Sequence, residues 1–253
     1  MDGSSSSEFR GYYKREHSLI RPYQGAGMEV CSLWEIMGST IVSQQQIRLT
    51  ADIQSLKGAI WNKVPCHARD WEIQVNFKVH GSTGTLFGDG LAIWYVQEPY
   101  QLGEVFGSKD YFRGLAVFLD TYSNHNGPHS HSHPYITAMV NNGSLHYDHD
   151  SDGTHTSLGG EHSGCEAKHS HNLHRYCPLA TTLVSATTGE LSDNHDIHSI
   201  RTFEQEFTRV ERQDEADTNA INPEAQNIAA PRDHIQDKRP SNLGGLAPLC
   251  SSL

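Results

Sequence analysis

The 253-residue sequence lacks the features that mark several classes of protein. It has no run of about 18 apolar residues, so no segment is expected to span a bilayer as a helix. Its start, MDGSSSSEFRGYY, has neither basic residues at its beginning nor an apolar stretch, and as written it is not expected to act as a signal peptide. The formal net charge of -11 disfavours a general nucleic-acid-binding protein, because such proteins are usually basic.

Cysteine is scarce and shows no metal-binding spacing. The five cysteines contain no CxxC pair, which argues against a zinc knuckle, and they allow at most two disulfides. Signs of catalysis are also missing. The sequence has no nucleophile elbow and no phosphate loop, and DWEIQVNFKV carries only Glu72 as an outward acid, whereas a glycosidase needs two flanking carboxylates. We therefore expect a protein that is not an enzyme.

From Tyr12 to about Phe207 the sequence pattern is one of strands and turns. Residues 71–79 alternate strictly between apolar and polar side chains, which is typical of a half-buried antiparallel strand. GLAIWYVQ and GLAVFLD are more continuously apolar, as expected of central strands in a packed sandwich. YITAMVNNGSLHYD predicts two strands joined by a hairpin at Asn142-Gly143. The pattern predicts an all-β fold with two antiparallel sheets.

Two regions depart from this pattern. Residues 124–174 hold 11 of the 17 histidines, most densely in HNGPHSHSH, which could bind Zn²⁺ or Ni²⁺ loosely through imidazole or could be a solvated loop. After about Arg212 the chain is polar and rich in Pro, Asn and Asp, and this composition predicts a disordered stalk or linker. Asn142-Gly143-Ser144 is a glycosylation sequon that matters only in the secretory pathway.

Oxygen-bearing side chains follow the apolar strand that ends at Leu119. Asp120 and Asn124 flank the main-chain carbonyl of Tyr122, and YDHDSDG supplies further carboxylates, including Asp152. Carboxylate, amide and backbone oxygens are the ligands that Ca²⁺ prefers. The same residues also favour ordinary turns, so both interpretations remain open at this point.

Two other loops carry unusual chemistry. Asp89 stands between two glycines immediately before an apolar strand, where glycine permits a backbone that aims a carboxylate into a shallow site. The loop TTGELSDNHD has a glycine that could leave backbone N–H groups free for a ligand.

Taken together, EHSLIRPY, IRLTAD, GAIWNKVPC, DWEIQVNFKVHG, GDGLAIWY, FGSKDYFRGLAVFLDTYSN, MVNNGSLHYDH and GELSDNHDI resemble the animal L-type lectins of the early secretory pathway. The resemblance is greatest to the vesicular integral-membrane branch, which is related to the ER–Golgi intermediate compartment cargo lectin. It implies a concanavalin-like antiparallel β-sandwich (jelly roll) that binds high-mannose N-glycans of glycoproteins with Ca²⁺. It also implies a role in ER–Golgi cargo sorting and a lumenal, membrane-anchored location.

Carried over residue by residue, the resemblance implies two sets of site residues. The calcium ligands would be Asp120, Tyr122 (main-chain carbonyl), Asn124 and Asp152. The carbohydrate-binding residues would be Ser55, Asp89, Asn124, His149, Gly189, Glu190 and Leu191.

The resemblance weakens between residues 165 and 185. The family has a longer stretch there, with additional core strands, an aromatic-rich strand just before Ser185-Ala186 and a cysteine paired with the counterpart of Cys165. Here Cys177 is a candidate partner. We expect a sandwich incomplete in the region 166–184, with open sheet edges. The expected domains are a disordered N-terminus (1–11), a lectin domain (12–210) and a disordered stalk (211–253). Two alternatives remain: a folding-impaired variant without binding activity, and a His-rich transition-metal-binding protein.

Overall fold

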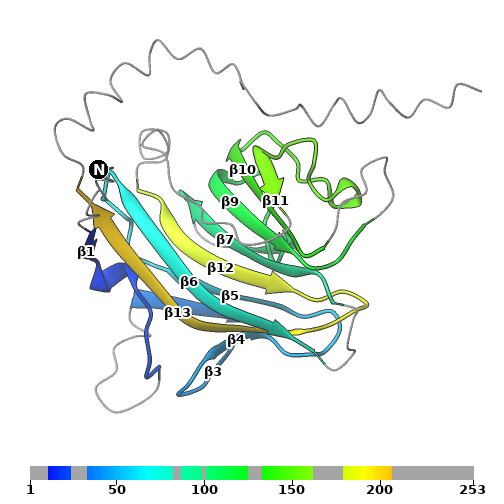
Figure 1. Cartoon of the computed structure of the whole chain (residues 1–253), viewed down its shortest axis with the longest axis horizontal. Helices are drawn as coiled ribbons and strands as arrows, with labels where there is room; N and C mark the ends of the chain where they lie inside the picture. Colours follow the sequence, from blue (N-terminus) through cyan, green and yellow to red (C-terminus); the bar gives the residue numbers. More distant parts are fainter. Residues whose placement is uncertain are drawn as a thin grey trace, which may run out of the picture. The chain divides into compact units, whose positions relative to one another are not determined.

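The computed structural model describes residues 11–23, 33–81, 87–98, 101–124, 133–161 and 179–206. Among these residues the strands form two antiparallel sheets (Figure 1). The first has the order β11-β10-β9-β7-β12-β5-β2, and its strands are β2 (Trp34–Gly38), β5 (Lys57–Asn62), β7 (Gly90–Val96), β9 (Arg113–Asp120), β10 (Tyr135–Asn142), β11 (Gly159–Glu161) and β12 (Thr181–Thr187). No helix in the described part of the chain is long and apolar enough to cross a membrane.

The second sheet is built around one long strand, β13 (Asn194–Gln205). On one side β13 pairs with β6 (Trp71–His80), and on the other with β1 (Gly11–Tyr13) and β4 (Ile47–Thr50), beyond which lies β3 (Ile41–Val42). The remaining elements are β8 (Leu102–Val105) and the short 3-10 helices η1 (Arg15–His17) and η2 (His149–Ser151). The predicted all-β sandwich is therefore confirmed.

The seven-stranded sheet is buried on both faces. One face packs against the second sheet through a core that includes Leu91, Val184 and Ile197. Trp94 and Phe118 belong to the core on the other face, which is completed by residues from connecting loops. Burial on both faces explains why β7 and β9 are continuously apolar, whereas β6 alternates.

The prediction of a hairpin at Asn142-Gly143 is wrong. β10 ends at Asn142, and the residues up to Asp148 form no strand. The side-chain Oδ1 of Asn141 accepts hydrogen bonds from the backbone N–H groups of Gly143 (2.9 Å) and Leu145 (3.1 Å). These local bonds satisfy the backbone that a returning strand would need. β10 pairs instead with β9 and β11.

A strand does form just before Ser185-Ala186, although it has no aromatic residue. All seven residues of β12 are buried, and the strand pairs with β7 and β5 in the interior of its sheet. The indole of Trp94 donates to Ser185 Oγ at 2.9 Å, so the polar residues of β12 are used within the core. Thr, Leu and Val therefore supply an interior strand in place of the aromatic-rich one. The edges of this sheet are β11 and β2, each of which pairs with one strand among the described residues.

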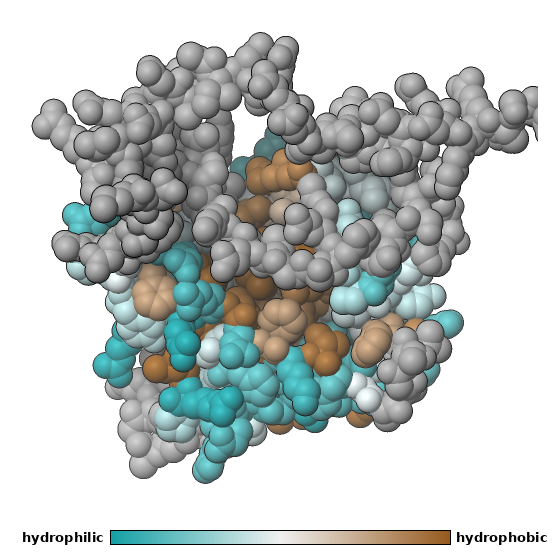
Figure 2. Space-filling view, viewed as in Figure 1, coloured by the Kyte–Doolittle hydropathy of each residue, from teal (hydrophilic) through white to brown (hydrophobic). Residues whose placement is uncertain are grey.

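The second sheet also has, among its described strands, an open edge of the kind that the shortened sequence predicts. Within the described residues, β6 pairs with β13 alone, so its other edge has no described partner. The inward side chains of β6, among them Ile73, Val75 and Phe77, are only partly buried. Figure 2, in the orientation of Figure 1, shows hydrophobic residues gathered across the middle of the face turned to the viewer.

Candidate functional site

The strand registers bring four separate loops to one end of the seven-stranded sheet. Gly90 at the start of β7 lies opposite Asp120 at the end of β9. Asp120 also lies opposite Tyr135, the first residue of β10. On the other side of β7, Gly90 lies opposite Thr187, the last residue of β12. Residues 89, 120–124, 133–134 and 188–191 are therefore neighbours, although they are spread over a hundred positions of sequence.

Asp120 is one of two deeply buried predicted ligands. The residue is 3% exposed, and Oδ1 accepts a 3.0 Å hydrogen bond from the backbone N–H of Tyr122. Oδ2 is buried without a hydrogen-bond partner among the described residues. Burial, reinforced by the nearby carboxylate of Asp152, raises the pKa of Asp120 to about 8. The ionised form of such a carboxyl group is favourable only beside a cation, and without one the group takes up a proton instead.

Asp152 reaches the same place from a different loop. It follows η2 in the left-handed backbone region (φ +50°), and its N–H donates to the carbonyl of His149 at 3.1 Å. A non-glycine residue in this conformation is uncommon and is often found at functional sites. Oδ1 of Asp152 accepts a 3.1 Å hydrogen bond from the backbone N–H of Asn124. The structure thus brings together Asp120, Tyr122, Asn124 and Asp152.

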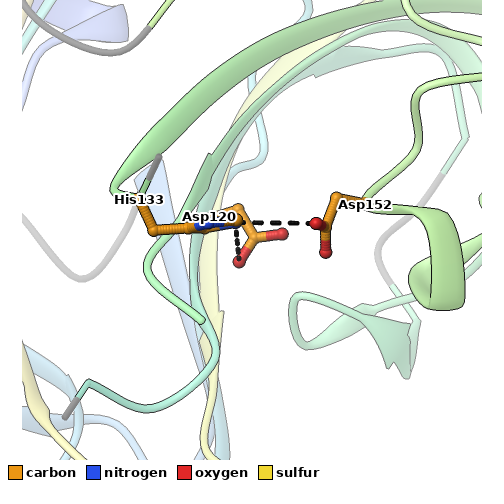
Figure 3. A group of neighbouring side chains, drawn as sticks. All are labelled: Asp120, His133 and Asp152. Atoms are coloured by element: carbon orange, nitrogen blue, oxygen red, sulfur yellow. Dashed lines mark ion pairs between the residues drawn. The ribbon is translucent and has the colours of Figure 1, made fainter. Parts of the chain in front are cut away.

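His133 joins these carboxylates, and sequence reasoning did not single it out. Its Nε2 lies 3.9 Å from Oδ1 of Asp120 and 3.7 Å from Oδ2 of Asp152. One ligand atom from each of the three side chains lies within 4.8 Å of the others. Figure 3 shows the three groups pointing toward one another from different parts of the chain.

Asp89 lies beside this cluster on the loop before β7. Its carbonyl accepts a hydrogen bond from the N–H of Thr121 (3.1 Å), which ties the loop to the end of β9. The preceding residue, Gly88, donates its N–H to the carboxylate of Asp193 at 2.7 Å. Burial raises the pKa of Asp89, and the nearby imidazole of His149 opposes the shift.

The loop after β12 closes against Asp89. A Cβ placed on Gly189 would lie 2.9 Å from Oδ2 of Asp89, so the two residues are in direct proximity. The carbonyl of Gly189 accepts from the N–H of Ser55 (3.2 Å), and Ser55 has a left-handed backbone (φ +59°). The carbonyl of Glu190 accepts from the side chain of Gln54, and the backbone of Leu191 packs against Gly88.

Two ring-bearing residues border the site. The imidazole Nε2 of His149 lies 3.0 Å from the carbonyl of Glu104, and its ring packs against Phe106 and Tyr147. The side chain of Tyr122 is 41% exposed, so a ligand can reach its ring. All the residues predicted for the two sets therefore lie at one end of the sheet, while their roles as ligands stay predictions.

The donor set at this end suits a hard divalent cation. Two buried carboxylates face each other, and one of their oxygens has no hydrogen-bond partner among the residues described. Ca²⁺ requires oxygen ligands of this kind, and the loop from Asp120 to Asn124 can add main-chain and amide oxygens. The residues present therefore fit a calcium ion.

Asp193 is the other residue that sequence reasoning missed. It is fully buried, and it holds the Gly88-Asp89 loop through the hydrogen bond described above. Its place in the polar loop TTGELSDNHD was the sequence feature that could have identified it. His133 had a weaker signal, because it is one of four histidines in HNGPHSHSH.

Two further predictions have a different status. Asn142 of the sequon is exposed at the end of β10, where Oδ1 accepts from the N–H of Ser144 at 3.1 Å. Its glycosylation stays a prediction. Cys165 and Cys177 lie outside the described residues, as do residues 1–10 and the predicted stalk. Cys66 is a buried free cysteine.

Comparison with known proteins finds relatives that are all of one kind. VIP36-like protein from Mus musculus is 42% identical over 271 residues, which cover 93% of this chain and 76% of that protein. Vesicular integral-membrane protein VIP36 from Canis lupus familiaris is 41% identical, covering 93% of this chain and 73% of that protein. The crystal structure of the VIP36 exoplasmic/lumenal domain in its Ca²⁺-bound form has a TM-score of 0.70 and 42% identity, covering 79% of this chain and 94% of that domain.

The legume-like lectin family matches residues 10–181, more than half of the chain. The proteins of this family bind carbohydrate and are not enzymes, in agreement with the absence of catalytic motifs noted above. On the match, the identities and the shared sandwich, this chain belongs to the legume-like lectin family.

Proposed function

We propose that this protein is a calcium-dependent lectin that binds high-mannose N-glycans of glycoproteins. The observation that carries the proposal is the gathering of Asp89, Asp120, Asp152 and the Gly189 loop at one end of the sheet. Solved structures of the VIP36 lumenal domain, 42–43% identical, include forms bound to Ca²⁺/Man2 and Ca²⁺/Man3GlcNAc, which supports the same ligands here.

The proposed sugar site works through hydrogen bonds from fixed groups. Asp89 accepts from neighbouring hydroxyls of a mannose ring, and charge-assisted bonds of this kind are the stronger ones. Asn124 donates its amide to a hydroxyl, and the exposed ring of Tyr122 covers the apolar side of the sugar. Ser55, His149 and the loop Gly189–Leu191 border the ring. Since the site is shallow, we expect weak affinity from a single sugar.

Calcium acts in this proposal by holding the loops in place. Asp120 and Asp152 carry the charge that binds the ion, while Tyr122 and Asn124 add a carbonyl and an amide oxygen. Without the cation, burial and the nearby carboxylate of Asp152 both disfavour the charged form of Asp120, in line with its raised pKa. Binding of the ion therefore orders Asn124 and the neighbouring Asp89 loop before sugar arrives.

The proposed cellular role is transport of glycoprotein cargo between the ER and the Golgi. Two relatives support it: VIP36 is described as a vesicular integral-membrane protein, and human ERGIC-53 is 30% identical over 76% of this chain. The proposed site would then face the lumen of the ER–Golgi intermediate compartment or the Golgi.

A thermal melt of the purified chain tests the proposal. The midpoint is measured with chelator, with Ca²⁺, and with Ca²⁺ plus either an α-mannose disaccharide or a galactose disaccharide. A ligand that binds only the folded state raises the midpoint, by about 2.7 kcal/mol of stability at a hundredfold excess over Kd. We expect one rise with Ca²⁺, a second with the mannose sugar and none with the galactose sugar.

The variant Asp89→Asn separates the two steps. It should keep the rise with Ca²⁺ and lose the rise with the mannose disaccharide, because Asp89 is assigned to the sugar alone. A cooperative melt that ignores Ca²⁺ in the wild type contradicts the proposal. Absence of any cooperative melt favours the alternative of a folding-impaired chain that binds nothing.

A further inference from the structure

The imidazole of His133 lies between two carboxylates in a nearly enclosed space. The side chains of His133, Asp120 and Asp152 are only 9%, 4% and 3% exposed. They come from the residues just before β10, from the end of β9 and from the residue after η2. Three chain segments therefore converge on one small volume, as Figure 3 shows.

The spacing of the three groups suits an ion better than it suits direct contact. The separations of 3.7 and 3.9 Å between Nε2 and the carboxylate oxygens are too long for hydrogen bonds. Ligands on a tetrahedral Zn²⁺, with bonds near 2.0–2.1 Å, lie about 3.4 Å apart. The two separations from Nε2 are within a few tenths of an ångström of this spacing, and all three ligand atoms lie within 4.8 Å of one another. The orphaned Oδ2 of Asp120 is a second, independent sign of a missing cation.

The chemistry of the donors distinguishes this set from a pure calcium site. Ca²⁺ selects oxygen ligands, whereas an imidazole nitrogen suits Zn²⁺, Ni²⁺ or Cu²⁺. We propose that Asp120, His133 and Asp152 form a site for a transition-metal dication of the zinc class, which competes with calcium for the same two carboxylates. The inference rests on the proposed function only in that Asp120 and Asp152 are the proposed calcium ligands.

The proposal makes one histidine different from its neighbours in the sequence. HNGPHSHSH contains four histidines, and loose binding by all of them is the simpler way for this stretch to hold metal. His133 alone is described by the structure, and it is already placed beside two carboxylates. A site built this way depends on His133 and is indifferent to His125, His129 and His131.

Metal titrations of the chelator-stripped full chain test this. Zn²⁺ and Ca²⁺ affinities are measured by calorimetry for the wild type, for His133→Phe, and for a control with His125, His129 and His131 all changed to Ser. Loss of a ligand should lower the ratio of Zn²⁺ to Ca²⁺ affinity at least tenfold in His133→Phe, roughly 1.4 kcal/mol of selectivity. The triple-Ser control should keep the wild-type ratio.

Nitrogen-15 NMR of the wild type gives a readout that needs no variant. Stoichiometric Zn²⁺ should shift the ring nitrogens of His133, and excess Ca²⁺ should reverse the shift if both ions use the same carboxylates. An unshifted His133 ring, or a triple-Ser control that alone loses Zn²⁺ binding, overturns the proposal.

The outcomes separate this inference from the proposed lectin function. Ca²⁺-dependent sugar binding with no His133-dependent Zn²⁺ binding leaves the lectin function standing and removes the transition-metal site. His133-dependent Zn²⁺ binding without any response to Ca²⁺ and mannose supports the transition-metal site and contradicts the lectin function.

Discussion

At the scale of single residues, Asp120 has opposite effects in the two states of the site. With a cation it is a ligand, and without one it is a buried carboxylate close to Asp152. Asp120→Asn keeps the shape and removes the charge. We expect the metal-free variant to be more stable than the metal-free wild type at pH 7 by roughly 1–3 kcal/mol, because only the wild type must bury a charge or take up a proton on folding. Urea denaturation in chelator measures the difference.

The same variant should no longer be stabilised by Ca²⁺. A matched change on the surface, Asp150→Asn, lies in η2 two residues before Asp152 but is exposed, and it should behave as wild type in both conditions. Equal stability of Asp120→Asn and wild type in chelator would mean that the carboxylate is already compensated without a cation.

Gly189 has no side chain, and this leaves room for the carboxylate of Asp89. A methyl group at this position would lie 2.9–3.0 Å from both carboxylate oxygens of Asp89, closer than ordinary contacts allow. Gly189→Ala should displace Asp89 and weaken mannose binding roughly tenfold or more, since small misplacements of positioned groups are costly. Calorimetric titrations with sugar and with Ca²⁺ should show the first weakened and the second retained. Val140→Ala, at an exposed position of β10, is the control.

The site residues differ in how far the sequence could predict them. Asp120 was predictable because it ends an apolar strand, where a polar side chain is conspicuous. His133 was not, because its place depends on the pairing of Tyr135 with Asp120, which no local pattern reveals. Ser55 is similar: resemblance suggested it, but only the structure shows its N–H bonded to the loop after β12.

At the scale of elements, β12 joins two parts of the seven-stranded sheet. Leu183 is 1% exposed in its core, whereas Leu158 is 65% exposed. Leu183→Ala should lower the free energy of unfolding by about 2–5 kcal/mol, and Leu158→Ala should change it by less than about 0.5 kcal/mol. Denaturant titrations of the two leucine variants test the placement. Similar effects of both changes would show that β12 is not in the core.

Element prediction succeeded where the pattern was long and failed where side chains compete for the backbone. The alternation of residues 71–79 predicted β6 almost to its ends. The Asn142-Gly143 signal failed because Asn141 and Asn142 hydrogen-bond locally and end the strand. β12 was overlooked since Thr, Leu and Val stand where an aromatic-rich strand was expected, although such β-branched residues are good strand formers.

At the scale of the whole molecule, a buried histidine links stability to pH. His195 is fully buried in β13, with Nδ1 2.7 Å from the hydroxyl of Thr50, and burial lowers its pKa to about 4. Above pH 6.5 both the folded and the unfolded chain keep this group neutral. Between pH 6.5 and 4 the unfolded chain takes up the proton first, so stability falls as pH falls, by up to about 3 kcal/mol.

Below about pH 4 the folded chain is protonated as well, and this loss levels off. His195→Asn keeps a partner for Thr50 and removes the titration. The stability of the wild type minus that of the variant should therefore decrease between pH 6.5 and 4 and stay constant from pH 7 to 8. Urea midpoints across this range provide the measurement. A flat difference would show that His195 is protonated equally in both states.

The position of β12 also constrains the order in which the domain is completed during synthesis. Its hydrogen-bonded contacts reach back 91 positions to Trp94 and 120 positions to Trp61. A nascent chain that has released β5 and β7 still lacks the strand that lies between them. Such distant pairings slow folding. Until β12 is available, the unpaired edges of β5 and β7 can pair with other chains. The seven-stranded sheet therefore cannot be completed before residue 187 has left the ribosome, and the second sheet must wait for β13.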